Sequence, residues 1–329
     1  MLALAQLENG QEADLFLLLA DKHEAHTREG KPFWRVTFRD ASLSITTPIW
    51  HDSPLAATCG QWQTGQFYKL RAAKQQTNFG AQLNIRKIRP TNDDDLAEGF
   101  DPLGLLPRSR YDAGEMFAQL VALAQQQISD VSLAALVSAI LHEQREALCD
   151  LPGGLHHHDF RSGWLEHTLS VARNAVFLAD KYAAIYPEQL PSLARDLVVA
   201  GAILHDIGKL IEIESTPAGA RFTPRGELVG HMVLGRDIVR EAAQRHPLSP
   251  EVLLRLEHII LSHQKTAEWG SPKPPMTLEA LLVHYADDID AKAQMLVEAI
   301  AEDSGDGWVT SRKNLLQQKL LKRLPEDFA

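Results

Sequence analysis

The fold is decided by the stretch Asp196-Leu-Val-Val-Ala-Gly-Ala-Ile-Leu-His205-Asp206-Ile-Gly208-Lys209. Its apolar residues occupy every side of a helix, which indicates a helix buried in a helical core. At its end a histidine and an aspartate stand side by side. A buried carboxylate costs several kcal/mol unless a cation or strong donors accompany it, so the doublet His205-Asp206 predicts such a partner nearby. Gly208 is expected in the left-handed conformation that ends many helices.

The chain around this stretch has helical apolar spacing from Tyr111 onward. The second domain, 111–329, is therefore expected to be all-α. The spacing predicts helices near 113–127, 131–148, 163–186, 193–206, 228–245, 250–263 and 277–301. The tail from Thr310 to Arg323 is expected to form an amphipathic helix, packed on this domain or at a subunit interface, which leaves a homo-oligomer open.

Further candidate metal ligands recur on these helices. A single buried histidine is more often a hydrogen-bonded core residue than a ligand. Here, however, six candidates follow one another across five predicted helices, and His and carboxylate side chains together suit divalent Mn, Fe, Co or Zn. The pattern predicts a site for two ions that share a carboxylate, formed by His167, His205, Asp206, His231, His263 and Asp287.

Several neighbours of these residues are less specific. The run His156-His157-His158 lies in a loop before the first ligand helix, where a solvated or supporting role is favoured over ligation. Lys209 is a candidate for neutralising phosphate charge, although a surface lysine at a helix end explains it equally well. His284 and Asp290 are expected to hydrogen-bond to ligands. His258 points about 140° away from His263 on the same helix and is interpreted as packed or solvated.

The first 90 residues have a different pattern, with short β-type runs separated by turn residues. Strands are predicted at 14–19, 33–39, 42–47, 66–71 and 82–88. Five short strands favour a small OB-like barrel over residues 1–92, with an SH3-like barrel as the alternative. Residues 93–110 are rich in Asp, Gly and Pro, and this composition predicts a linker.

Aromatic and basic side chains alternate along the predicted barrel. Stacking of bases on aromatic rings suits single-stranded nucleic acid of any sequence. About half of these rings are expected in the barrel core instead. The candidate contacts to single-stranded RNA or DNA are Trp34, Arg35, Trp50, Tyr68, Lys74 and Phe79.

Composition limits the class of protein. The chain of 329 residues has a net charge of −10, but residues 1–90 hold about 11 Lys and Arg against about 8 Asp and Glu, so the negative charge lies in the second domain. No apolar run approaches the roughly 20 residues of a membrane helix, so no membrane partner is expected. The two cysteines, Cys59 and Cys149, exclude a disulfide framework and, with no signal-type N-terminus, favour a cytoplasmic location.

Five motifs together resemble the HD superfamily of metal-dependent phosphohydrolases. They are Gly163-Trp-Leu-Glu-His167, Leu204-His-Asp-Ile-Gly-Lys209, Gly230-His231, Leu261-Ser-His263 followed by Gly270-Ser-Pro, and His284-Tyr-Ala-Asp287-Asp-Ile-Asp290. They look most like the YhaM-type branch, whose members are 3′-to-5′ exoribonucleases with an OB-fold before the HD domain. The resemblance therefore covers nearly the whole chain.

This resemblance implies roles for individual residues. His167, His205, Asp206 and Asp287 would hold one metal ion, and Asp206, His231 and His263 the second, with Asp206 as the bridge and Mn²⁺ as the first expectation. Asp206 and Lys209 would form the catalytic group. Many relatives have two adjacent histidines where this chain has His263-Gln264, which puts occupancy of the second site in doubt.

Two other functions remain open from the sequence. An HD enzyme acting on a nucleotide or a cyclic dinucleotide would have the same metal site. A non-catalytic single-strand-binding protein is favoured only by Gln264.

Overall fold

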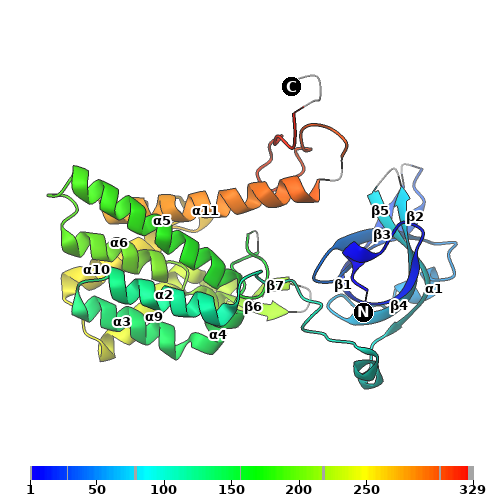
Figure 1. Ribbon diagram of the computed structural model, residues 1–329, viewed down its shortest axis with the longest axis horizontal. Coiled ribbons are helices and arrows are strands. Elements are labelled where there is room, and N and C mark those ends of the chain that lie inside the picture. The colour runs from blue at the N-terminus through cyan, green and yellow to red at the C-terminus, as the bar shows by residue number, and fades with distance from the viewer. Residues whose placement is uncertain are drawn as a thin grey trace. The chain divides into compact units, whose positions relative to one another are not determined.

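The chain forms two compact units, Met1–Arg108 with Thr216–Gly219, and Ser109–Ser215 with Ala220–Ala329 (Figure 1). The computed structural model describes residues 2–27, 29–77, 80–155, 157–216, 219–303 and 305–324. The domain limits drawn from the sequence, 1–92, 93–110 and 111–329, stay a prediction.

The first unit is an antiparallel sheet of five strands, as predicted. The strands are β1 (Glu12–His26), β2 (Pro32–Arg39), β3 (Ser44–Trp50), β4 (Phe67–Thr77) and β5 (Gly80–Pro90), and their order in the sheet is β3-β2-β1-β4-β5. The two outermost strands approach each other, because the Leu83 amide on β5 donates to Thr47 Oγ1 on β3 over 2.8 Å. The sheet therefore curls into a barrel, with the short helix α1 (Ala56–Cys59) after β3. This arrangement is compatible with an OB barrel.

The interior of this barrel is apolar. Leu15, Leu17 and Leu19 alternate along β1 and are almost fully buried, as the period of two along a strand requires. The rings of Phe38 and Tyr68 meet edge to face with centroids 6.2 Å apart, which is a favoured geometry for buried aromatic pairs. A short 3₁₀ helix, η1 (Leu4–Gln6), adds Leu4 to this core.

The segment expected to be a linker is folded at its start. Residues Asp93–Glu98 form a 3₁₀ helix, η2, and Asp95 in it is fully buried. Arg89 donates to both carboxylate oxygens of Asp95, over 2.7 and 2.6 Å. The Arg89 guanidinium holds the pKa of Asp95 well below its usual range, although burial acts the other way. A charged side chain thus stays buried here because it is paired in bidentate geometry.

The second unit is helical. Its elements are α2 (Ala113–Gln127), α3 (Val131–Glu143), α4 (Arg145–Asp150), α5 (Gly163–Ile185), α6 (Ser192–Leu204), α7 (Lys209–Glu212), the hairpin strands β6 (Ile213–Thr216) and β7 (Gly219–Phe222), α8 (Pro224–Val229), α9 (His231–Arg245), α10 (Pro250–Ser262), the 3₁₀ helix η3 (Ala267–Trp269) and α11 (Leu278–Glu302). The predicted helices are confirmed, except that two are divided. The break at Gly230, with φ of 78°, separates α8 from α9.

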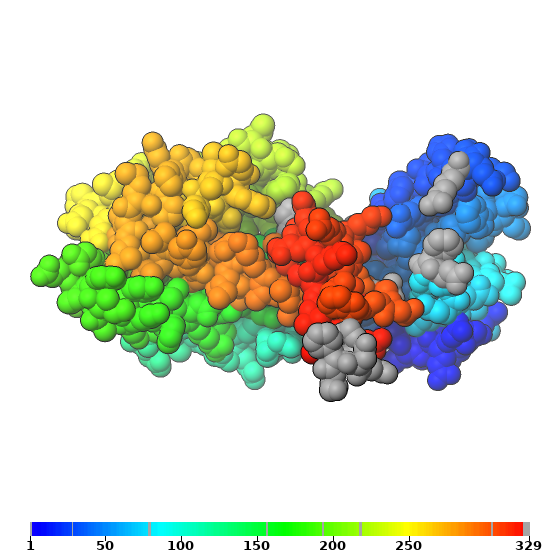
Figure 2. Space-filling view, turned by 90° about the horizontal axis from the view of Figure 1, so that it is seen from above, coloured from blue at the N-terminus to red at the C-terminus, as the bar shows by residue number. Residues whose placement is uncertain are grey.

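Helix α6 is the centre of this unit. It packs against α2, α3, α5, α10 and α11, which accounts for its apolar residues on every side. Figure 2 shows α11 on the surface between α5 and α10, with which it packs. None of the helices in the described parts of the chain is long and apolar enough to cross a membrane.

The prediction of a helix at the tail is wrong. Residues after Thr310 run without helix as far as Arg323, and Val309 forms an isolated antiparallel bridge with Leu321. The chain turns back instead, because the Thr310 amide donates to the Leu320 carbonyl and Leu320 is buried. Lys322 is bound to Asp303 over 2.7 Å at the end of α11. Pairing with the preceding segment wins over the weak preference of a short isolated helix.

Candidate metal centre

Helix ends bring the candidate ligands together. His205 and Asp206 follow α6 directly, His231 opens α9, and His263 follows α10. Gly208 is not in the left-handed conformation that we expected, since its φ is −67°. Its role is close packing: a Cβ atom there would lie 1.9 Å from the His231 carbonyl oxygen. The missing side chain lets the start of α9 approach the His205-Asp206 doublet.

The first group of ligand atoms surrounds Asp206 Oδ2. That oxygen lies 3.3 Å from His205 Nε2 and 3.6 Å from His167 Nε2. Asp287 Oδ1 lies 3.2 Å from the same nitrogen of His167 and 3.8 Å from that of His205. All four side chains are buried. They are the four residues predicted for the first ion.

The second group surrounds the other oxygen of the same carboxylate. Asp206 Oδ1 lies 3.4 Å from His231 Nε2 and 3.5 Å from His263 Nε2. One carboxylate therefore faces both groups, one oxygen to each. This is the arrangement expected of a bridging ligand between two ions.

The outer nitrogens of these four imidazoles are all held by acceptors. His205 Nδ1 donates to the Ala202 carbonyl and His263 Nδ1 to the Ile260 carbonyl, over 2.7 and 2.8 Å. His167 and His231 donate the corresponding hydrogen to Asp290 and Glu212, each over 2.8 Å. Since a carbonyl or an ionised carboxylate only accepts, each Nδ1 carries the hydrogen and each Nε2 is left to bind a metal ion.

The spacing of the inner nitrogens fits metal ions. His167 and His205 have their Nε2 atoms 3.3 Å apart, and those of His231 and His263 are 3.4 Å apart. Two nitrogens bound to one ion at about 2.1 Å each, at about 90–110°, lie roughly 3.0–3.4 Å from each other. Asp206 Oδ1 is buried and has no hydrogen-bond partner among the described residues. A divalent cation in each group would satisfy all of these atoms.

The ionised carboxylates of the centre favour the binding of a cation. Burial lowers the pKa of His167, but the carboxylates of Asp287 and Asp290 outweigh it and raise that pKa to about 9. The pKa of Asp206 lies well below its usual range, because the charge of Lys209 and the neighbouring histidines overcome burial. The carboxylates thus remain ionised, and positive charge is favoured between them and the imidazoles.

Gln264 and His258 lie near the ligands, and the sequence left open whether either of them adds a ligand to the second group. Gln264 donates from Nε2 to Asp287 Oδ2 over 3.4 Å, so it turns toward the first group instead of adding a ligand to the second. His258 accepts the Met276 amide over 2.9 Å and joins neither group. The second group therefore has three candidate ligands, Asp206, His231 and His263.

Lys209 is buried rather than on the surface. Its Nζ lies 2.6 Å from Asp206 Oδ2 and also donates to the Gly153 carbonyl. Two of its three hydrogens are used in this way. The side chain therefore orients the bridging carboxylate, and its predicted contact with phosphate stays a prediction.

Glu212 was not assigned by the sequence, and the histidine loop was expected to be solvated or to support the site. Glu212 accepts from both the backbone amide and Nδ1 of His231, over 2.7 and 2.8 Å. In the loop before α5, His158 Nε2 lies 3.1 Å from Asp290 Oδ2, and these two residues with His167 form a third cluster able to hold a metal ion. His156 lies outside the described residues. His284 donates to the His263 carbonyl over 2.7 Å, a supporting role of the predicted kind.

The nucleic-acid candidates on the barrel fall into two classes. Tyr68 is buried and its hydroxyl is used by the Gln63 amide and by Gln66, so we correct the expectation that it contacts a ligand. Trp34 packs partly against the barrel core. Lys74 reaches the Leu4 carbonyl over 3.4 Å. Phe79 lies outside the described residues.

The remaining two candidates lie together on the outer face of β2 and β3. Arg35 is exposed, and Trp50 is 46% exposed. Trp50 is the partner of Phe33 across the strands, with ring centroids 4.9 Å apart. This aromatic pair with its neighbouring arginine is the accessible part of the predicted nucleic-acid surface.

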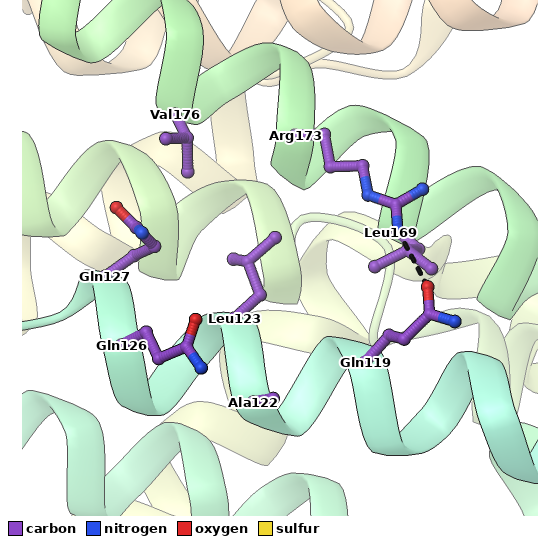
Figure 3. A pocket seen from close by; sticks show the side chains of 8 residues that line it. All are labelled: Gln119, Ala122, Leu123, Gln126, Gln127, Leu169, Arg173 and Val176. Carbon is purple, nitrogen blue, oxygen red and sulfur yellow. Dashed lines mark hydrogen bonds between the residues drawn. The ribbon is translucent and has the colours of Figure 1, made fainter.

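A groove between α2 and α5 is separate from the metal centre. It has a volume of about 370 Å³, and Arg173 donates to Gln119 across it over 2.7 Å (Figure 3). Gln126, Gln127 and apolar side chains complete its lining. None of the six predicted metal ligands is among them, so the groove has no part in the metal chemistry.

Comparison with known families agrees with this geometry. Residues 164–292 match the family model of the HD domain, and this span contains all six predicted ligands. An HD domain implies metal-dependent phosphohydrolase activity. The helical unit that follows the five-stranded barrel contains an HD domain at residues 164–292.

Proposed function

We propose that this protein is a metal-dependent 3′-to-5′ exoribonuclease that removes 5′-mononucleotides from single-stranded RNA. The observation that carries the proposal is the carboxylate of Asp206, which faces His167 and His205 with one oxygen and His231 and His263 with the other. Two bound divalent ions would activate water and stabilise the leaving oxygen of a phosphodiester.

Burial of the centre favours attack at a chain end. Asp206 is 1% exposed and His263 is fully buried. An internal phosphodiester has chain on both sides, and it needs a wider opening to such a centre than a terminal nucleotide does. The burial therefore favours an exonuclease over an endonuclease.

The chain's own residues would act mainly by holding the site in place. Glu212 and Asp290 fix the rings of His231 and His167, and Lys209 fixes the bridging carboxylate. Because these supports are in place before a substrate arrives, little reorganisation is needed during the reaction. Manganese is our first choice of ion, since nitrogen and oxygen ligands together suit it.

The barrel supplies a reason to prefer RNA over a small substrate. Phe33 and Trp50 form a ring pair on the outer face of β2 and β3, beside the exposed Arg35. OB barrels bind nucleic acid on this face, and base stacking contributes about 1–3 kcal/mol for each base. DNA single strands would stack in the same way, so they are a second substrate to be tested.

The first experiment compares RNA labelled at its 3′ or its 5′ end, with Mn²⁺ or with EDTA. We expect stepwise shortening from the 3′ end with Mn²⁺, and none with EDTA or in the double variant His205→Ala, Asp206→Ala. RNA that stays intact with every divalent metal would contradict the proposal.

A second candidate is an HD phosphohydrolase for a nucleotide or a cyclic dinucleotide, which the same burial of the centre also admits. The variants Trp50→Ala and Arg35→Ala separate the two, with bis(p-nitrophenyl) phosphate as the small substrate. For the exonuclease, these changes raise KM for RNA several-fold and leave cleavage of the small diester unchanged. If RNA is not cleaved but nucleotides are, the second candidate replaces the first.

A further inference from the structure

The loop between α4 and α5 is folded tightly against the start of α5. The Gly153 amide donates to the His158 carbonyl over 2.8 Å, and the Trp164 amide donates to the Leu151 carbonyl over 3.1 Å. A Cβ atom at Gly163 would lie 2.1 Å from the His158 carbonyl oxygen, so the loop depends on the missing side chain there. These contacts hold Gly153 and His158 together beside the start of α5.

His157 lies on this loop next to the first metal group. Its ring centroid is 5.0 Å from that of His167, with the rings inclined by 61°. A Cβ atom built on Gly154 would be 3.8 Å from His157 Cε1 and 3.4 Å from Lys209 Nζ. The imidazole of His157 thus stands beside both a metal ligand and the lysine that holds Asp206.

Both ring nitrogens of His157 are buried and lack a hydrogen-bond partner among the described residues. Native proteins rarely leave such atoms unpaired, because each unsatisfied group lowers stability. His157 also belongs to none of the clusters found in the described chain that could hold a metal ion, although His158 and His167 do. A group other than a metal ion is therefore the candidate partner of His157.

We propose that His157 donates a hydrogen bond to a phosphoryl oxygen of the substrate at the metal centre. A neutral imidazole carries one N–H donor in either tautomer, and an anionic phosphoryl oxygen is a strong acceptor. Lys209, beside it, already uses two hydrogens on Asp206 and Gly153. The unused donor of His157 is thus the better placed of the two to recognise phosphate.

The ligand class is a phosphomonoester or phosphodiester group, whatever is attached to it. The inference therefore rests on phosphohydrolase activity and holds equally for RNA and for a small nucleotide. His157 would contact the substrate directly, whereas His158 acts through Asp290, 3.1 Å away.

The test compares His157→Phe, which keeps a ring of similar shape, with His157→Gln, which keeps a donor. Hydrolysis of bis(p-nitrophenyl) phosphate and of RNA is measured with Mn²⁺. Loss of one hydrogen bond to a charged group predicts a fall in kcat/KM of roughly 10- to 100-fold for His157→Phe, with partial recovery in His157→Gln. His142→Phe, an exposed histidine on α3 outside the metal clusters, is the matched control and should not change kcat/KM.

A second measurement does not depend on turnover. Inorganic phosphate is titrated calorimetrically into the Mn²⁺-loaded protein, and Mn²⁺ into the metal-free protein. We expect phosphate affinity to fall about 10-fold or more in His157→Phe while Mn²⁺ affinity stays within 2-fold of wild type. Unchanged phosphate affinity would overturn the inference, and so would a parallel loss of Mn²⁺ affinity, which would make His157 a metal ligand.

The two proposals fail in different ways. A wild-type protein that cleaves small diesters but not RNA contradicts the exonuclease function alone. A wild-type protein that cleaves no phosphoester contradicts the proposed function, while phosphate titration still decides the role of His157. If the wild-type protein binds no phosphate at all, the proposed hydrogen bond from His157 to phosphate is wrong.

Discussion

The two units differ in the polar side chains that they bury beside their apolar cores. The barrel interior contains Phe38 and Tyr68, whereas the equally buried interior of the HD domain contains His205, Asp206 and His263. An aromatic ring gains free energy by leaving water, but a buried carboxylate loses it unless a cation accompanies it. Burial of the aromatic rings therefore stabilises the barrel, whereas burial of the His and Asp ligands maintains a site that is complete only with metal ions.

Substitution of the bridging carboxylate, Asp206, has the largest expected effect on metal binding and hydrolysis. Asp206→Asn removes the charge shared by both ligand groups, so we expect Mn²⁺ affinity to fall by more than roughly 100-fold and hydrolysis to fall below detection. Calorimetric titration with Mn²⁺ measures the loss.

A buried carboxylate on α6 is the matched control for this change. Asp196 accepts the Ser129 and Asp130 amides, each over 2.8 Å, and has no contact with the ligand groups. We expect Asp196→Asn to lower stability without lowering Mn²⁺ affinity. Equal losses of Mn²⁺ affinity in the two variants would mean that any buried carboxylate supports this domain, and the contrast between the units would not hold.

A substitution in the barrel core should lower stability and leave Mn²⁺ affinity unchanged. Phe38→Ala removes a fully buried ring in contact with Tyr68, and we expect it to lower the free energy of unfolding of the barrel by about 3–5 kcal/mol. Mn²⁺ affinity should not change. Scanning calorimetry of the full chain follows the barrel transition, and Trp50→Ala on the outer face should move it little. A loss of Mn²⁺ affinity in Phe38→Ala would show that the two interiors are coupled.

The sequence predicted most of the fold because its apolar periods are regular. Period two along the strands and 3.6 along the helices placed all five strands and the longer helices of the second unit. The spacing of the histidines and aspartates selected side chains that do converge. The prediction of a helix at the tail was wrong because the helical spacing of its leucines does not show the backbone pairing between Thr310 and Leu320.

Two features of the site depend on contacts between distant segments. Glu212 reads as an ordinary polar residue, since only the return of the chain through the hairpin β6–β7 brings His231 to it. Gly208 is needed because the start of α9 packs on it, which no local pattern shows. Tyr68 was assigned to a surface because alternation along a strand does not tell which face is inside.

Glu212 allows a test within the metal centre itself. Glu212→Gln keeps the size of the side chain but weakens the acceptor for His231 Nδ1, so we expect affinity for the second ion to fall roughly 10- to 100-fold. The first group contains neither residue and should bind as in wild type. Two-site analysis of Mn²⁺ titrations separates the ions. If both affinities fall together, the two groups bind as one unit, and Glu212 supports more than His231.

The smallest effect concerns Asp95, a fully buried carboxylate in the first unit, which is paired with Arg89 over 2.7 and 2.6 Å. The guanidinium lowers the pKa of Asp95 in the folded chain, so its contribution to stability is present above the unfolded value of roughly 3.9 and is lost as the pH falls below it. We expect Asp95→Asn to lower the melting temperature of the barrel at pH 7, and the gap from wild type to narrow at pH 3. The barrel transition is the one that Phe38→Ala moves. If the difference in melting temperature between Asp95→Asn and wild type is the same at pH 3 and pH 7, Asp95 acts through the geometry of its hydrogen bonds and not through its charge. A buried carboxylate could then have a structural role alone, without the metal ion that the HD domain requires.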